Sequence, residues 1–308
     1  MDTEQLFQTY RTLLFSLAYR MLGSVMDAED VVQDAFLAVN QLPTDANIRN
    51  VKAYLCKIVT NRCLNLLQSS AKQREVYVGT WLPEPLVHLE DVSLDPSEIY
   101  QQRETISTAY LMLLQQLSAV ERAVFLLREI FQYPYDEIAN MVGKSSFNCR
   151  QIFHRAKKGI RHEPPDLATS TVTETQVRQF IQSVIAGDAN RLLELLSPDA
   201  VHYTDGGGKA PAALQPVVGA RRVIPFYRQW MDWFGRPDSH YSYIITTVNG
   251  SPGIVMRIGG RIAYVYSFEA SDSRIHSIYA VANPDKLKYL KEVVDENHRI
   301  GTENRPVG

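Results

Sequence analysis

Cysteine is scarce in this chain. Its 308 residues include three cysteines, Cys56, Cys63 and Cys149, and no two of them form a CxxC pair. A disulfide framework and a zinc site are therefore not expected, whereas free thiols suit a reducing compartment. We expect the protein to hold no metal and no cofactor.

Long apolar runs are also missing. No stretch approaches the roughly 20 apolar residues of a membrane helix. The first residues lack the basic end and the apolar core of a secretion signal. The composition, 45% hydrophobic and 21% charged, is that of a soluble globular protein. We expect a cytoplasmic chain of two or three domains with no membrane contact.

The net charge is small, at −2, but it is unevenly distributed. Residues 49–74 contain six basic side chains and no acidic one, and residues 144–161 again contain six and none. Most of the charged residues between these two segments are acidic. Two separate cationic surfaces suggest two contacts with a polyanion such as a nucleic acid.

The first third of the chain has the apolar spacing of three helices. The first covers about residues 6–21 and is expected to stop at Gly23. The second opens with the acids of residues 27–30, where the helix dipole favours negative charge. The third covers about residues 51–67.

Proline-rich breaks divide the chain near residues 79–96 and 162–166. After the second break, helices (about 176–186 and 220–233) are followed by consecutive strands that we expect to be antiparallel (241–248, 253–258, 262–268 and 275–281). The expected fold class is therefore two all-α domains followed by an α+β domain. The predicted boundaries are a helical domain at 1–76, a linker at 77–99, a helical domain at 100–163, a linker at 164–172, the α+β domain at 173–295 and a tail at 296–308.

The most specific local pattern is a helix-turn-helix at residues 133–161. Pro134 can begin its first helix, Gly143 supplies the turn, and Ser145 or Ser146 can cap the second helix. Such a second helix fits the major groove, with polar side chains on base edges and its basic end on phosphates. The alternative is a solvated surface helix, which the glycine turn and the acid-free outer face disfavour. The outward residues expected to contact DNA are Ser146, Asn148, Arg150, Gln151, His154, Arg155, Lys157 and Lys158.

Two long segments resemble a known family, the extracytoplasmic-function sigma factors of RNA polymerase. One segment resembles region 2 of that family; it is LAYRMLGSVMDAEDVVQDAFLAVNQ (residues 17–41). The other segment resembles region 4; it is LSAVERAVFLLREIFQYPYDEIANMVGKSSFNCRQIFHRAKKGI (residues 117–160). The resemblance covers about the first half of the chain. It implies a protein that recognises promoters and is not an enzyme.

The resemblance also implies partners and residue roles. The partners would be promoter DNA and core RNA polymerase, through its β′ clamp and β flap, and the helix-turn-helix would read the −35 element. The −10 element would be contacted by Arg49, Lys52, Lys57, Asn61, Arg62 and Asn65. The β′ clamp would be contacted by Asp27, Glu29, Asp30, Gln33 and Asp34.

Short motifs refine the resemblance. WLPEPL and DGGGK are similar to signatures of the sigma-J-like group, whose fused C-terminal domain is SnoaL-like, and NPDKL (residues 283–287) lies where the group carries a third motif. The apolar linker side chains are expected to pack on a folded domain, and the glycine triplet fits either a close approach of another segment or a plain loop. The implied role is regulation in cis, with the C-terminal domain contacting the linker and the first domain; a small ligand or a regulatory protein there stays open. The regulatory residues would be Trp81, Leu82, Pro83, Glu84, Pro85, Leu86, Asp205, Gly206, Gly207, Gly208 and Lys209.

Two rival functions remain open. A SnoaL-like cone can house acid–base catalysis, for which the candidates are His202, Tyr203, Asp205 and His276. Because the first three run directly into the glycine triplet, we favour satisfied polar residues at a strand end. A dimeric regulator of palindromic DNA is the second rival, but it would not need the first helical domain.

Overall fold

The computed structural model describes residues 3–43, 48, 50–75, 77–88, 106–160, 172–236 and 238–290. The chain divides into two compact units, one made of residues 1–76 and 109–163 and the other of residues 77–108 and 164–308. Each unit therefore combines segments that are distant in the sequence. Arg49 and the predicted tail lie outside the described residues. Within the described ranges, no helix is both long enough and apolar enough to cross a membrane.

The first unit begins with three helices, α1 (Thr3–Leu22), α2 (Val25–Asn40) and α3 (Val51–Glu75). The predicted stop at Gly23 is confirmed, because this glycine takes the left-handed φ of 69° that ends α1. The second helix was predicted to begin at the acids of residues 27–30, but α2 begins earlier, at Val25. Ser24 caps the helix before the acids by accepting a hydrogen bond from the Asp27 N–H at 3.1 Å. The predicted third helix is confirmed and continues past residue 67.

The first unit continues with α5 (Thr108–Gln115), of which Thr108 alone belongs to the second unit, and then with α6 (Ala119–Phe125), a π-helical turn η1 (Leu126–Ile130), α7 (Tyr135–Val142) and α8 (Ser146–Gly159). Arg122 of α6 is 3% exposed. Its guanidinium donates to the carbonyl oxygen of Met21, in the last turn of α1, and to that of Leu117 at 3.3 Å. A cation at the C-terminal end of a helix satisfies free carbonyls and complements the dipole, so Arg122 ties α6 to α1.

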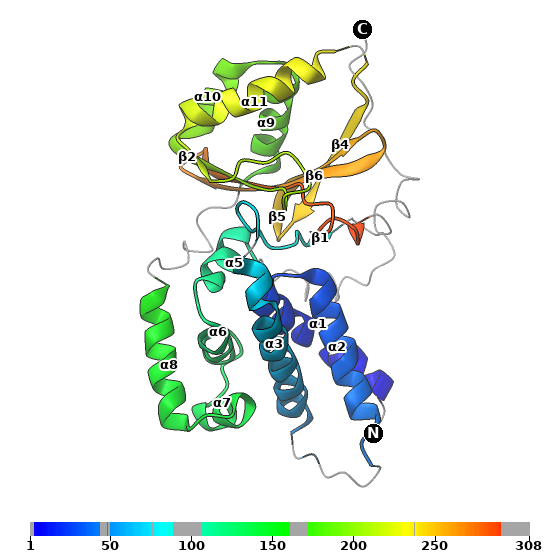
Figure 1. The fold of residues 1–308 in the computed structure, drawn as a ribbon, viewed down its shortest axis with the longest axis vertical. Coiled ribbons are helices and arrows are strands. Elements are labelled where there is room, and N and C mark those ends of the chain that lie inside the picture. Colours follow the sequence, from blue (N-terminus) through cyan, green and yellow to red (C-terminus); the bar gives the residue numbers. More distant parts are fainter. Residues whose placement is uncertain are drawn as a thin grey trace. The chain divides into compact units, whose positions relative to one another are not determined.

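The second unit is an α+β domain, as predicted. Its helices α9 (Glu174–Ile185), α10 (Ala189–Leu195) and α11 (Ala220–Phe234) lie along one face of a seven-stranded sheet (Figure 1). The strand order is β1-β4-β5-β6-β7-β2-β3. The strands are β1 (Val87–His88), β2 (Leu196–Asp205), β3 (Val217–Val218), β4 (Tyr241–Val248), β5 (Ser251–Ile258), β6 (Arg261–Ser271) and β7 (Arg274–Val281).

The sheet contains three strands beyond the four that were predicted, the two-residue strands β1 and β3 and the longer β2. The four predicted strands pair antiparallel as expected, but β2, which was not predicted, lies parallel to β7. A parallel pair needs a long crossover, and here the chain from α11 through β6 supplies it. This pairing places the end of β2 beside the end of β7, with Asp205 opposite Val281.

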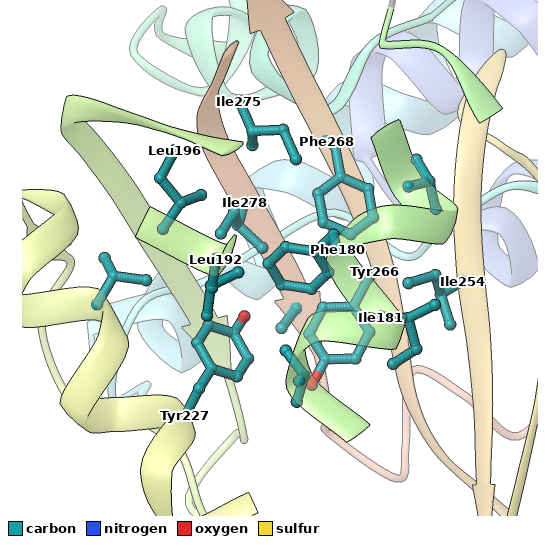
Figure 2. Close-up of a cluster of buried hydrophobic side chains, with 14 of the residues drawn as sticks. Phe180, Ile181, Leu192, Leu196, Tyr227, Ile254, Tyr266, Phe268, Ile275 and Ile278 are labelled. Atoms are coloured by element: carbon teal, nitrogen blue, oxygen red, sulfur yellow. The ribbon is translucent and has the colours of Figure 1, made fainter. Parts of the chain in front are cut away.

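Side chains of the helices and the sheet interdigitate in one apolar core (Figure 2). Phe180 of α9 stands edge-on to Tyr227 of α11 and to Phe268 of β6, with ring centroids 5.5 and 5.0 Å apart. Such pairs contribute about 0.5–1.5 kcal/mol each beyond the burial of their area. The core holds the helices on one face and leaves the other face of the sheet for the linker.

Candidate nucleic-acid interface

The predicted helix-turn-helix is confirmed as a structure. Pro134 precedes α7, and Gly143 ends it with a left-handed φ of 65°. Ser145 caps α8 by accepting a hydrogen bond from the Asn148 N–H at 3.2 Å. The buried stripe of α8 consists of Cys149, Ile152, Phe153 and Ala156.

The outer face of α8 is cationic, but two of its cations have acidic neighbours. Lys157 pairs with Glu129 at 3.2 Å, and Arg155 lies 3.8 Å from Glu121. Lys158 has no ion pair among the residues that the structure describes. Phosphates that bind Arg155 or Lys157 therefore replace an existing carboxylate neighbour, whereas a phosphate that binds Lys158 does not.

Two predicted DNA contacts are less exposed than the sequence suggested. Ser146 and Asn148 are half-buried, and the Ser146 Oγ is shielded from solvent. At about 100° per residue, Ser146 lies only about 60° from Cys149, on the flank of the buried stripe. Phe147, which lies between Ser146 and Asn148, is 67% exposed. Sequence reasoning missed it because only polar side chains were considered as DNA contacts. Its position out of phase with the buried stripe was the available signal.

The candidates for the −10 element separate into two groups on α3. Lys57, Asn61 and Asn65 are exposed and recur at intervals of four residues, so they share one face of the helix. Arg62 is exposed next to this face and pairs with Asp34 of α2 at 2.7 Å. Lys52 belongs to a different surface, because its ammonium lies 5.9 Å from the centre of the Tyr133 ring.

The acidic face of α2 contains two apolar side chains that sequence reasoning missed. Met26 is 44% exposed and Leu37 is 58% exposed. They fall on the same side of the helix as Asp30 and Gln33, at spacings of three and four residues. A face that combines exposed acids with exposed Met and Leu is more typical of a docking surface than of a solvated one.

The two helical parts of the first unit contact one another. Tyr133, in the loop before α7, donates a hydrogen bond to the Cys56 Sγ of α3 at 3.3 Å. Burial raises the pKa of both groups, so each remains protonated. With the ammonium of Lys52 over the same ring, α3 and the segment before α7 form one contact surface.

In the second unit the linker is bound to the sheet, as predicted from its apolar side chains. β1 pairs antiparallel with β4, which adds the linker as an edge strand. Leu82 is fully buried and Val87 is 7% exposed. The segment passes the sheet face opposite the helices (Figure 1).

A buried carboxylate is the main polar anchor of the linker. Asp205 is fully buried at the end of β2. It accepts hydrogen bonds from the Tyr77 hydroxyl, from the Leu82 N–H at 2.8 Å and from the Gly207 N–H at 3.0 Å. Its fourth partner is the Lys286 ammonium at 2.7 Å. Burial, followed by the contact with this carboxylate, raises the pKa of the Tyr77 hydroxyl.

Lys286 links all three motifs of the second unit. Its ammonium also donates to the Leu82 carbonyl oxygen, and it lies 4.1 Å from the centre of the Trp81 ring and 5.2 Å from that of Tyr77. Side chains from the linker, from the end of β2 and from the segment after β7 therefore enclose one buried ion pair. The linker is held by specific polar contacts as well as by apolar burial.

The glycine triplet at residues 206–208 is a site of close approach, which settles the alternative left open by the sequence. A Cβ on Gly206 would lie 2.2 Å from the Ala210 carbonyl oxygen, and one on Gly207 would lie 2.2 Å from the Asn283 side chain. Gly208 takes a left-handed φ of 70° beside Val78 of the linker. Larger residues would displace the segments that surround Asp205.

Two of the residues considered for the rival catalytic function, His202 and Asp205, do not share a site. Alternation along β2 turns His202 toward α11 and Asp205 toward the linker, on opposite faces of the sheet. Burial lowers the pKa of His202 to about 3, so its ring is neutral at pH 7. The cavity between the helices and the sheet, lined by Tyr227, Tyr266 and six apolar side chains, offers about 10 Å³, roughly the room of one water molecule.

Comparisons with known proteins agree with this geometry. Residues 6–73 match the family Sigma-70 region 2, and residues 107–159 match the family Sigma-70, region 4. The ECF RNA polymerase sigma factor SigJ of Mycobacterium tuberculosis (strain ATCC 25618 / H37Rv) is 32% identical over 91% of this chain and 92% of its own. The probable ECF RNA polymerase sigma factor SigI of the same strain is 29% identical over 92% and 94%. A crystal structure of the Mycobacterium tuberculosis extracytoplasmic function sigma factor SigJ superimposes with a TM-score of 0.70 at 30% identity, covering 92% of this chain and 98% of that one.

Proposed function

Because this chain belongs to the extracytoplasmic-function sigma factors of RNA polymerase, we propose that it reads a −35 element with α8 and a −10 element with α3. Sigma factors bind core RNA polymerase and promoter DNA, and this one would do so in the cytoplasm. The observation that carries the proposal is the pair of exposed polar and cationic helix faces, one in each sigma region; α8 contains no acidic residue, and α3 contains none before its last residue, Glu75. Because α3 belongs to region 2 and α8 to region 4, the two faces could bind two separate promoter elements.

The acidic face of α2 is the proposed contact with the β′ clamp. Asp27, Glu29, Asp30, Gln33 and Asp34 supply charge and polar groups, and Met26 and Leu37 supply apolar area. Protein interfaces combine apolar area with polar and charged groups, as this face does. A contact between the region 4 half of the unit and the β flap completes the proposed attachment to core polymerase.

The compact first unit has to open before it can read both elements. Elements centred about 25 base pairs apart are separated by roughly 85 Å of B-form DNA. A compact body of this unit's size has a radius of gyration of about 14 Å and is too small to span that distance. We therefore propose that core polymerase separates α1–α3 from α6–α8 and breaks the contact between Tyr133 and Cys56.

Opening can be measured by energy transfer between two labels. Dyes on introduced cysteines at Gln68 of α3 and Asn140 of α7, both exposed, should show high transfer in the free protein and a large loss when core polymerase is added. The three native cysteines are buried, so they should not take up dye. A control pair at Gln8 and Gln68, both within the first three helices, should keep its transfer. If energy transfer between the labels at positions 68 and 140 stayed high in an initiating complex, the opening step would be refuted.

The second unit is proposed to regulate the first in cis, because it holds the linker that joins the two sigma regions. Bound through β1 and the Asp205–Lys286 pair, the linker has less freedom than an unstructured segment. Its fixed end would limit how far the two DNA-reading halves can separate. Regulation would then follow from the fraction of molecules in which the linker is bound to the sheet.

Transcription from a defined −35/−10 promoter tests both the proposed sigma activity and the proposed regulation in cis. Purified chain plus core polymerase should start transcripts at that promoter, and core polymerase alone should not. A chain that ends before Pro164 keeps both sigma regions but loses the sheet, and its promoter-dependent output should differ from that of the intact chain. Because truncation bares Leu82, the truncated chain with Leu82→Ser controls for the exposed apolar surface. Equal core binding and equal output from truncated and intact chains would exclude cis regulation but leave the sigma activity standing.

A further inference from the structure

The exposed phenylalanine of α8 has no evident structural role. Phe147 is 67% exposed, and none of the aromatic contacts among the described residues includes it. It lies in the first turn of the helix, two residues after the Ser145 cap. Leaving a large aromatic side chain in water gains nothing for folding, which points to a contact made outside the described chain.

The position of Phe147 identifies the kind of contact. Phe147, Gln151, His154 and Lys158 are spaced by four, three and four residues, so they form one stripe at the centre of the outer face. This stripe changes from apolar at the N-terminal end, through hydrogen-bonding groups, to a cation at the C-terminal end. In a recognition helix the N-terminal side chains meet base edges and the basic end meets phosphates. Phe147 is thus at the base-reading end.

The chemistry of the major groove leaves one partner for an aromatic hydrocarbon. Donors and acceptors on guanine, adenine and cytosine require polar side chains, whereas the 5-methyl group of thymine is the apolar feature of the groove. A polymerase surface is the other conceivable partner, but Phe147 shares its stripe with three groups suited to DNA. We propose that Phe147 makes the chain selective for a thymine in the −35 element by packing on the thymine 5-methyl group, an inference that rests on α8 reading that element.

Uracil substitution isolates this contact, because uracil differs from thymine only by the missing methyl group. The full-length chain with core polymerase is first used to select its −35 element from random sequence. Each thymine of that element, on either strand, is then replaced in turn by uracil, and promoter affinity is measured. Removing one buried methyl contact should weaken binding by about fourfold at one or two positions.

The matching protein variants complete the cycle. With Phe147→Ala the fourfold loss on uracil substitution should disappear, and with Phe147→Leu part of it should remain. Leu214→Ala, at a 69% exposed apolar residue of the second unit, is the matched control and should leave the uracil scan unchanged. Since the Phe147 side chain is exposed, these variants should retain the helix.

The outcomes separate this inference from the proposed function. Identical uracil scans for the native chain and Phe147→Ala would overturn the thymine contact while leaving −35 recognition intact. Loss of core polymerase binding by Phe147→Ala, with no dependence on thymine, would assign the side chain to a protein partner and also overturn it. If the native chain with core polymerase selects no −35 element at all, then the DNA-reading function fails and this inference fails with it.

Discussion

Replacing Asp205 with alanine should destabilise the second unit by about 3–5 kcal/mol, because it leaves a buried ammonium without its counterion. Lys286 is 8% exposed, and its ammonium contacts the linker at the Leu82 carbonyl oxygen and the Trp81 ring. The same change leaves the Leu82 N–H and the Tyr77 hydroxyl without their acceptor. The expected result is a linker released from the sheet and a lower midpoint in urea denaturation.

The opposite half of the ion pair should be less sensitive. In Lys286→Met the Asp205 carboxylate keeps three donors, the Tyr77 hydroxyl and the N–H groups of Leu82 and Gly207. Hydrogen bonds to a carboxylate favour its charged form and offset part of the missing charge. We therefore expect Lys286→Met to lose less stability than Asp205→Ala.

A second salt bridge in the same motifs provides the control. Lys209 pairs with Asp285, but the two side chains are 56% and 42% exposed. Exposed pairs contribute about 0–1 kcal/mol, so Lys209→Met should leave the denaturation midpoint nearly unchanged. Intrinsic fluorescence, which includes Trp81 against the Lys286 ammonium, would follow release of the linker directly. Equal midpoints for Asp205→Ala and Lys209→Met would show that the linker is not anchored by the buried pair.

Local sequence patterns were sufficient to predict most of the helices and strands. Gly143 and the Ser145 cap fixed the helix-turn-helix, because a left-handed residue and a side-chain acceptor are needed at those places. The turns at Asn249-Gly250 and Gly259-Gly260 likewise separate the predicted strands, with positive φ at all four residues. These features depend on neighbours within a few residues.

Contacts between distant segments could not be predicted in the same way. Asp205 and Lys286 are 81 positions apart, and Tyr77 and Asp205 are 128 apart. Their meeting depends on β2 lying parallel to β7, which no local period encodes. The two-residue strand β1 is too short to leave an alternating pattern. The family resemblance named the three motifs, but only the packed chain brings them around one ion pair.

Neutralising the basic end of α8 should reduce promoter affinity on the order of 10²–10³-fold at 0.1 M salt. The triple variant Arg155→Gln, Lys157→Gln, Lys158→Gln removes three proposed phosphate contacts from the exposed face. Each contact releases about 0.9 counterion, so the slope of log affinity against log salt should become shallower by about 2.7 for the triple variant and by about one unit for each single variant. The assay is a salt titration of promoter binding by the chain with core polymerase.

Gln151→Ala is the informative control, since Gln151 lies on the same exposed face but carries no charge. It should change the preferred −35 sequence and leave the salt slope intact, because base contacts specify sequence without releasing counterions. The single variants also distinguish the cations from one another. A slope change for Lys158→Gln but not for Lys157→Gln would mean that Lys157 keeps its pairing with Glu129 on DNA. If no single or triple variant changes the slope, the phosphates lie against a different face of the first unit, and α8 does not hold the −35 element.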